Sequence, residues 1–132
     1  MLMSATDREL FFRFAKDYRR AENERVEFEE IERDGESLFR LDLRDAWEFA
    51  TKKDYTENWE SEMHERFCFW SESDWRRELE AVGFRVAPDS HSYLNPWIEE
   101  NRLAGQVELF DPETGEKLTY PPTTILLIGE KL

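Results

Sequence analysis

The stretch Ser71-Glu-Ser-Asp-Trp-Arg-Arg-Glu-Leu-Glu-Ala-Val-Gly-Phe-Arg-Val86 holds the most complete set of local structural signals in the chain. Ser71 and Asp74 have the spacing of a capping box, in which each side chain binds a backbone N–H at the start of a helix. Apolar residues then recur at helical spacing, and Gly83 suits the left-handed residue that follows a helix. The stretch therefore predicts a helix that ends at this glycine and a strand over Phe84–Val86.

Downstream of this unit, the sequence predicts a short helix and three further strands. Asn95-Pro96 matches an N-cap followed by proline at the first helical position, so we expect a helix to about Ala104. Val107–Phe110 and Lys117–Tyr120 flank a segment with Pro and Gly, which predicts two paired strands. The unbroken apolar run Thr123–Ile128 is typical of a strand covered on both faces.

Upstream of the unit, the apolar spacing predicts three helical segments. Thr6 and Glu9 match a capping box, and we expect the first helix from about Asp7 to Arg20. The second helix is expected from Arg44 to about Lys53, where positive charge suits a helix C-terminus. A third helical piece is expected over about 56–66.

A hairpin is predicted between the first two helices. Asp34-Gly35 separates two alternating runs, so we expect Arg25–Glu32 and Ser37–Asp42 to pair as strands. The acidic residues of the first strand are typical of a solvated face. Together these segments predict one α+β domain over residues 1–132, with an antiparallel or mixed sheet and three to four helices.

Composition excludes several classes of function. The chain carries 18 basic and 31 acidic side chains in 132 residues, and this net charge of −13 repels phosphate backbones and anionic lipids. The single Cys68 forms no internal disulfide, and no apolar run approaches the ~20 residues of a membrane span. The start of the sequence has no secretory pattern. We expect a cytoplasmic protein that binds neither nucleic acid nor membranes.

The order of these segments resembles a known enzyme family. Residues 66–86 resemble the aromatic strand end, capped helix, Gly-Phe step and strand near the C-terminus of class I S-adenosylmethionine-dependent methyltransferases. Residues 123–132 resemble the last antiparallel strand of that family, and residues 48–67 are similar to an acidic insertion of some bacterial members. The resemblance implies the C-terminal, substrate-side half of a Rossmann-like methyltransferase.

The cofactor-binding signature of that fold is absent from the sequence. Dinucleotide-type sites need a glycine-rich turn after the first strand, followed by an acidic residue. No G-x-G pattern occurs, and the five glycines are isolated. We expect that this chain alone binds no cofactor, although the resemblance implies S-adenosylmethionine for a complete enzyme.

This absence has a consequence for the last strand. In the family that strand lies between two neighbours, one of which belongs to the half that is absent here. The resemblance therefore implies an open edge at Ile125–Ile128, to be covered by a second copy in a homodimer or by a cofactor-binding partner chain.

No metal or nucleophile motif accompanies these elements. His64 and Cys68 are four residues apart, but zinc takes three or four protein ligands, so we expect an exposed histidine and a buried cysteine. No G-x-S-x-G elbow occurs, and His91 falls in a segment that we expect to be a polar loop. Catalytic residues are left unassigned.

The resemblance suggests which residues contact a substrate. It places an acidic pair near the mouth of a substrate pocket, although a solvated helix face is the ordinary explanation of such a pair. Nearby aromatic residues could line the same mouth, and core and lid packing explain these residues equally well. The candidate substrate-binding residues are Glu62, Glu65, Phe69, Trp70, Tyr93 and Trp97.

Two functions stay open. The first is the substrate-binding or lid part of a methyltransferase, which is not catalytic alone. The alternative is a noncatalytic small-ligand-binding or oligomerisation module of α+β fold.

Overall fold

A computed structural model describes residues 1–20, 23–68 and 70–132 and confirms the α+β class. Three helices of ten residues are accompanied by shorter helical segments, and every strand pair is antiparallel. The elements in chain order are β1 (Leu2–Ala5), α1 (Arg8–Asp17), β2 (Phe28–Arg33), β3 (Glu36–Leu41), α2 (Leu43–Lys52), α3 (Trp59–Glu62), α4 (Glu72–Ala81), β4 (Phe84–Val86), β5 (His91–Tyr93), α5 (Pro96–Ile98), η2 (Glu99–Leu103), β6 (Val107–Phe110), β7 (Thr124–Leu126) and β8 (Gly129–Lys131).

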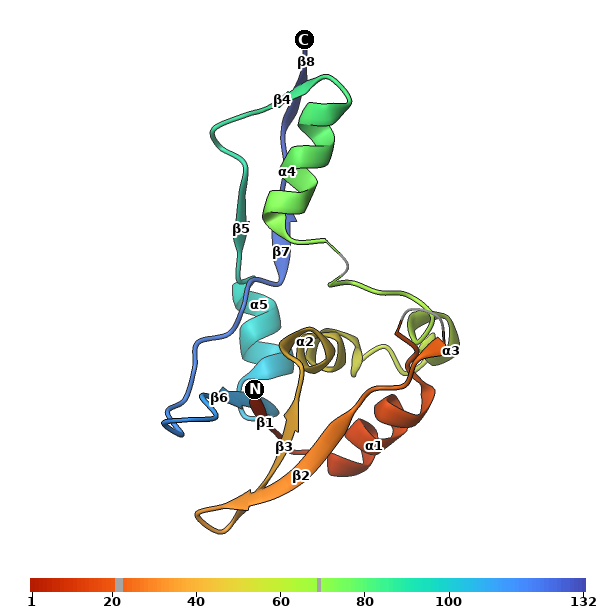
Figure 1. The fold of residues 1–132 in the computed structure, drawn as a ribbon, viewed down its shortest axis with the longest axis vertical. Helices are drawn as coiled ribbons and strands as arrows, with labels where there is room; N and C mark the ends of the chain where they lie inside the picture. Colours follow the sequence, from red (N-terminus) through yellow and green to blue (C-terminus); the bar gives the residue numbers. More distant parts are fainter. Residues whose placement is uncertain (21–22, 69) are drawn as a thin grey trace.

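The central sheet has the strand order β2-β3-β1-β6 (Figure 1). One of its two inner strands, β1, pairs with β3 on one side and β6 on the other, so that Leu2 lies opposite both Arg40 and Phe110. Leu2 and Met3 are both fully buried. Since successive strand residues point to opposite faces, both faces of the sheet are covered here. The sequence predicted no strand in this segment.

One aromatic cluster joins the first two helices to this sheet. The ring of Phe11 in α1 stacks on Phe39 of β3 with 4.1 Å between centroids, and it meets Phe49 of α2 edge-on at 5.2 Å. All three side chains are buried. Ring pairs in these geometries add to the free energy of burial, so the cluster fixes α2 against the sheet.

The predicted hairpin is confirmed. β2 and β3 pair from Phe28↔Leu41 to Arg33↔Glu36, and the chain reverses at Asp34 and Gly35. Both turn residues have positive φ, 53° and 81°, as a type I′ turn requires.

The start of α1 differs from the prediction. Asp7 is the N-cap, and its Oδ1 accepts the backbone N–H of Leu10 at 3.0 Å. Thr6 instead donates its hydroxyl to the carbonyl oxygen of Gly105 at 2.7 Å, so the Thr6–Glu9 capping box was wrong. The helix also ends earlier, because Tyr18 is already extended.

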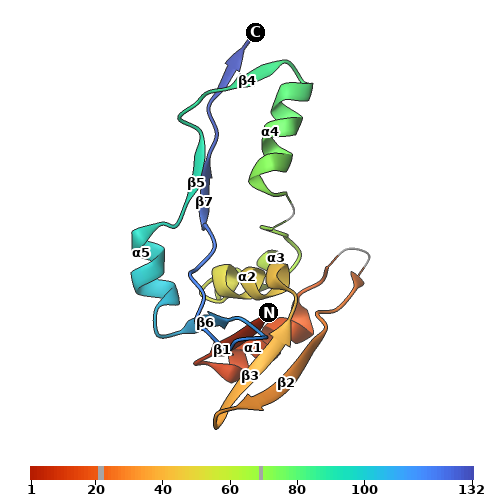
Figure 2. The same cartoon turned by 60° about the vertical axis from the view of Figure 1, so that its left-hand side comes forward.

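α4 and the strands β4, β5, β7 and β8 form an arm that extends away from the central sheet in both views (Figures 1 and 2). β4 pairs with β8, and β5 pairs with β7, each as a two-stranded ribbon. The predicted capping box of Ser71 and Asp74 is confirmed in both directions, and Gly83 has φ 94°. The predicted strand over Phe84–Val86 is confirmed as β4.

The last apolar run is more exposed than predicted. It forms only β7, and Leu126 and Ile128 are 45% and 40% exposed, so a strand covered on both faces was wrong. A two-stranded ribbon provides no layers to cover it. Its pairing partner includes His91, which was predicted in a loop but lies in β5.

Three further predictions differ in extent. The helix expected over 56–66 is limited to α3. The helix after Asn95 begins as predicted, with the Asn95 side chain as N-cap, but continues as the π-helical η2. The strand expected at 117–120 is reduced to a bridge between Phe110 and Lys117.

Candidate functional site

An apolar cavity of about 370 Å³ lies where the arm joins the body of the protein, and we call it the groove. α2 provides one wall, the segment between α3 and α4 with the first turn of α4 provides a second, and the chain entering β7 provides a third. The residues that define the groove are Leu43, Arg44, Trp47, Thr51, Phe67, Cys68, Trp70, Ser71, Trp75, Pro121, Pro122, Thr123, Thr124 and Ile125.

Tryptophans form two walls of the groove. The Trp47 indole is 6% exposed and donates its N–H to the carbonyl oxygen of Pro122 at 3.0 Å, which ties α2 to the chain entering the arm. Trp70 and Trp75 meet edge to face with 4.5 Å between centroids, and both remain partly exposed. Large, rigid rings that line a partly open cavity suit an apolar or planar ligand.

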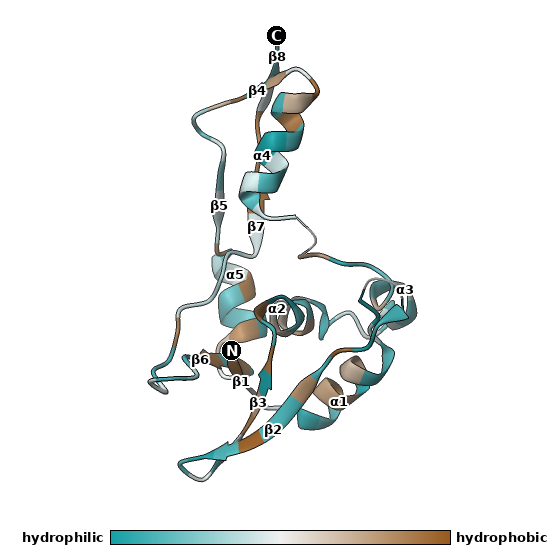
Figure 3. Cartoon of the chain, viewed as in Figure 1, coloured by the Kyte–Doolittle hydropathy of each residue, from teal (hydrophilic) through white to brown (hydrophobic). Residues whose placement is uncertain are grey.

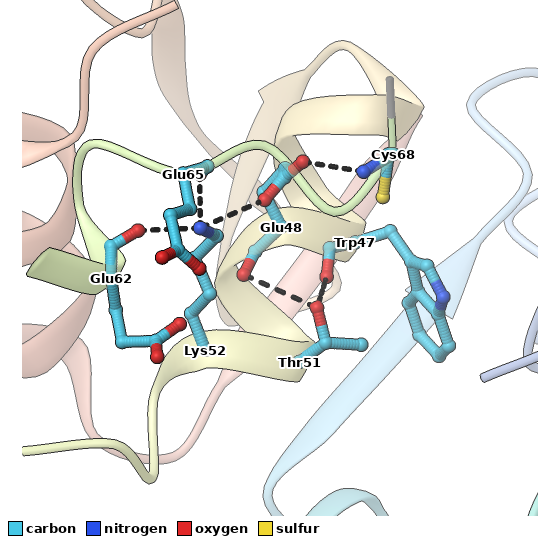
Figure 4. Close-up of polar contacts among 7 residues, drawn as sticks. All are labelled: Trp47, Glu48, Thr51, Lys52, Glu62, Glu65 and Cys68. Atoms are coloured by element: carbon cyan, nitrogen blue, oxygen red, sulfur yellow. Dashed lines mark hydrogen bonds and ion pairs between the residues drawn. The ribbon is translucent and has the colours of Figure 1, made fainter. Parts of the chain in front are cut away.

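A buried lysine holds the segment that forms the second wall (Figure 4). Lys52 is fully buried, and its ammonium donates hydrogen bonds to the backbone carbonyl oxygens of Glu62 and Glu65. The neighbouring Glu48 accepts the backbone N–H of Cys68 at 2.7 Å through Oε1. α2 therefore fixes the path of the chain from the end of α3 to the groove.

Burial opposes the charge on both members of this pair. Desolvation lowers the pKa of the Lys52 ammonium, while the Glu48 carboxylate opposes that shift. Desolvation raises the pKa of Glu48, while the N–H of Cys68 and the charge of Lys52 oppose it. The ammonium also lies 4.1 Å from the ring centroid of Phe67, a cation–π contact that compensates part of the lost hydration.

The Cys68 thiol, which lines the groove, is held in its neutral form. Burial, followed by the charge of Glu48, raises its pKa to about 12. A thiol with this pKa is inert as a nucleophile at neutral pH. Arg44 and Cys68 are the ionisable residues of the groove, which therefore offers packing and desolvation rather than proton transfer.

The buried pair was missed by sequence reasoning. The positive charge at the end of α2, to which Lys52 and Lys53 both contribute, is explained in the sequence only by the helix C-terminus. The available signal was that Glu48 and Lys52 are four residues apart, as in a helical ion pair, and lie among Trp47, Phe49 and Ala50, which are also buried.

The structure separates the candidate substrate-binding residues into different places. Trp70 lies in the groove, whereas Glu62 and Glu65 lie around Lys52 through their carbonyl oxygens and do not line it. Tyr93 lies in β5 and Trp97 in α5, outside the groove lining. Phe69 lies outside the described residues.

The described ranges contain neither a metal-binding cluster nor a membrane-spanning helix. No group of three or more His, Cys, Asp or Glu residues in these ranges could hold a metal ion. None of the helices seen there combines the length and apolar character needed to cross a bilayer.

Comparison of the chain with protein-family models, with curated proteins and with solved structures gave no match.

Proposed function

We propose that this chain is the substrate-side part of an S-adenosylmethionine-dependent methyltransferase and that it does not catalyse methyl transfer alone. The resemblance of residues 66–86 to the family motivates this assignment. The groove would hold the methyl acceptor, and a separate polypeptide region would bring the cofactor. A cytoplasmic location belongs to the same proposal.

The main support for the proposal is that the arm lacks a second layer to cover its apolar residues. Figure 3 shows hydrophilic and hydrophobic residues along α4, and no residue of this helix is buried. Trp75, Leu79 and the C-cap residue Val82 repeat at helical spacing, and Val82 is 69% exposed. A helix with an apolar stripe normally buries it against a second layer, and isolated two-stranded ribbons are marginally stable in water. The arm therefore needs a further layer beside it.

The edge of β7 offers a place for that layer to join. β7 has one partner, β5, so its other edge is unpaired among the described residues. Unpaired backbone groups on an apolar strand readily accept another strand. We propose that a cofactor-binding partner chain, or a second copy of this chain, pairs along Ile125–Ile128.

The groove suits the needs of methyl transfer to an apolar or planar acceptor. Transfer from a sulfonium depends on orientation and exclusion of water, and both can be supplied without a nucleophilic side chain. Trp47 is fixed by its hydrogen bond to Pro122, and the Trp70–Trp75 pair provides an adjoining aromatic surface. Ordered walls of this kind would orient a flat acceptor.

Two measurements test the proposal. Calorimetric titration of the chain with S-adenosylmethionine should show no binding at micromolar concentrations, and binding would show that a cofactor site is present after all. The second measurement uses a protein that is encoded next to this chain and contains a glycine-rich strand–turn–helix. A mixture of that protein with this chain should transfer the methyl group from labelled S-adenosylmethionine to an acceptor. Failure of every such mixture to transfer methyl groups would count against the assignment.

A noncatalytic ligand-binding module is the second candidate, because Trp47 and the Trp70–Trp75 pair give the groove an aromatic lining that suits an apolar ligand. In that case naphthalene should quench tryptophan emission without any partner, and Trp70→Phe should reduce the quenching. Trp97→Phe is the matched control, since Trp97 does not line the groove. Unchanged emission on addition of naphthalene would remove the support for this function.

A further inference from the structure

The described lining of the groove carries one formal charge. Arg44 and Cys68 are its ionisable residues, and the thiol stays neutral because burial, followed by Glu48, raises its pKa to about 12. The guanidinium of Arg44 stays protonated at any physiological pH. None of the described lining residues is an aspartate or a glutamate. A chain with a net charge of −13 therefore has an apolar groove whose own charge is positive.

Arg44 directs none of its side-chain donors at the rest of the protein. It is exposed, and among the described residues its guanidinium has neither an ion-pair partner nor a hydrogen-bond partner. A guanidinium has five N–H donors in a planar arrangement that matches the two oxygens of a carboxylate. These donors are therefore available to an anionic group that enters the groove.

Acidic residues lie near Arg44 on the side away from the groove, in a second cavity of about 290 Å³ that Arg44 also lines. The acids of this second cavity are Glu24, Asp42, Asp45 and Glu48. Asp42 caps α2 and accepts the backbone N–H of Arg44 at 2.8 Å, while Asp45 and Glu48 are buried in ion pairs with other cations. Glu24 is exposed to solvent. None of the four forms an ion pair with Arg44 among the described contacts, so the guanidinium is still open to an anion.

The position of Arg44 on α2 connects this charge to the aromatic walls. Arg44 and Trp47 are three residues apart in the helix, so they lie on the same side, and both line the groove. Leu43, in the same turn as Arg44, is 43% exposed and extends the apolar lining to the guanidinium. A flat ring beside Trp47 would thus have a cation next to one end. Ligand sites of this type combine an apolar lining with a few polar groups that fix orientation.

We propose that the groove binds a planar aromatic carboxylate, with its ring against Trp47 and the Trp70–Trp75 pair and its carboxylate at Arg44. The assignment rests on the groove being the ligand site of the proposed function, and it names the class of that ligand. A neutral aromatic compound would leave the donors of Arg44 to water, and an aromatic cation would meet a charge of its own sign. The groove should therefore select among rings of one shape by the charge of their substituent.

The first test uses the unaltered protein and three ligands with the same ring system. 2-Naphthoate, 2-naphthamide and 2-naphthamidine carry planar substituents of similar shape that are negative, neutral and positive. Each is titrated by calorimetry, and the backbone amide chemical shifts of Cys68 and Ile125 locate the binding in the groove. We expect 2-naphthoate to bind more tightly than 2-naphthamide by about fivefold or more, and 2-naphthamidine to bind most weakly.

The other outcomes separate this assignment from the function on which it rests. Equal affinities for the three ligands, or tighter binding of 2-naphthamidine, would overturn the preference for a carboxylate while the groove remained a ligand site. Binding of none of the three at millimolar concentration would overturn both. No cofactor is present in these titrations, so their result is independent of methyl transfer.

The second test removes the charge from the groove. Arg44→Gln should bring the affinities for 2-naphthoate and 2-naphthamide together, and the exposed position of Arg44 should let the variant fold. Arg40→Gln is the matched control, because Arg40 is exposed on β3 outside the groove lining and its loss changes the net charge equally. This control should keep the preference of the native protein. The same preference in both variants would contradict the placement of the carboxylate at Arg44.

Discussion

Lys52 and Glu48 form a buried ion pair one helical turn apart on α2, with 3.5 Å between Nζ and Oε2 and side-chain exposures of 0% and 3%. Their hydrogen bonds connect α2 to the segment that follows α3. Lys52 donates to the Glu62 and Glu65 carbonyl oxygens, and Glu48 accepts from the Cys68 N–H. The pair therefore does more than stabilise α2. It holds the second wall of the groove against the helix.

Replacing Lys52 tests this role directly. Lys52→Met removes the donors of two backbone carbonyls and leaves the Glu48 charge buried without its partner. Loss of one member of a buried pair typically costs about 3–5 kcal/mol, and we expect a decrease of this size in the free energy of unfolding. Urea denaturation followed by circular dichroism provides the measurement.

Lys16→Met is the matched control, because Lys16 is exposed on α1. Such a surface change should alter the free energy of unfolding by no more than about 0.5 kcal/mol. If the Lys52 and Lys16 variants lose the same stability, the ion pair does not hold this segment.

The thiol of Cys68 should react slowly. Its pKa of about 12, raised by burial and by Glu48, leaves very little thiolate at pH 8. We expect the rate constant with Ellman's reagent to be lower than that of free cysteine by about two orders of magnitude or more, since the thiolate is the reacting species. Lys52→Met should accelerate the reaction if the segment loosens. A native protein that reacts as fast as free cysteine would refute the burial of this thiol.

Asp45 should make the stability of the protein depend on pH in a defined direction. Burial raises its pKa above the ordinary value of 3.8, although Arg20 opposes the shift. The contribution of a group with a raised folded-state pKa is complete below the unfolded pKa and is lost as pH rises through the folded pKa. We expect the difference in the free energy of unfolding, native protein minus Asp45→Asn, to decrease as the pH is raised from 3.8 to neutrality. Urea denaturation of both proteins across this interval measures the difference, and a rise with pH would contradict it.

Local signals predicted the elements whose cause is local. The capping box of Ser71 and Asp74, the Asp34-Gly35 turn and the Asn95 cap each satisfy backbone groups within a few residues. The Thr6 prediction failed because Asp7, one residue later, provides the cap and Gly105 takes the threonine hydroxyl. Competing caps of this kind are decided by distant contacts.

Elements that depend on distant pairing were not visible in the sequence. β1 is short and has no flanking turn signal, yet it becomes an inner strand because β3 and β6 pair with it from far along the chain. Of the candidate substrate-binding residues that the structure describes, Trp70 lines the groove, whereas the other walls come from α2 and from the chain before β7, which the sequence did not connect with a site. Which charges become buried on α2 also depends on the segment that covers them.

The open edge of β7 leads to the last prediction, which concerns association. If a second copy pairs along this edge, light scattering during gel filtration should give twice the 16.0 kDa mass of one chain. Leu126→Lys places a charge on the strand, where Leu126 is already 45% exposed, so the isolated chain should tolerate it. Lysine on an edge strand opposes further pairing, and we expect the variant to have the mass of a single chain. Thr119→Lys is the matched control, because Thr119 is exposed and lies outside the arm, and it should leave a strand-paired dimer intact. Val82→Lys instead places a charge on the apolar stripe at the end of α4, where Val82 is 69% exposed. A dimer that persists in Leu126→Lys but is lost in Val82→Lys would place the contact on α4 instead of the strand edge. A native protein that is monomeric would show that a second copy does not pair with this edge, and a different chain would then be the partner.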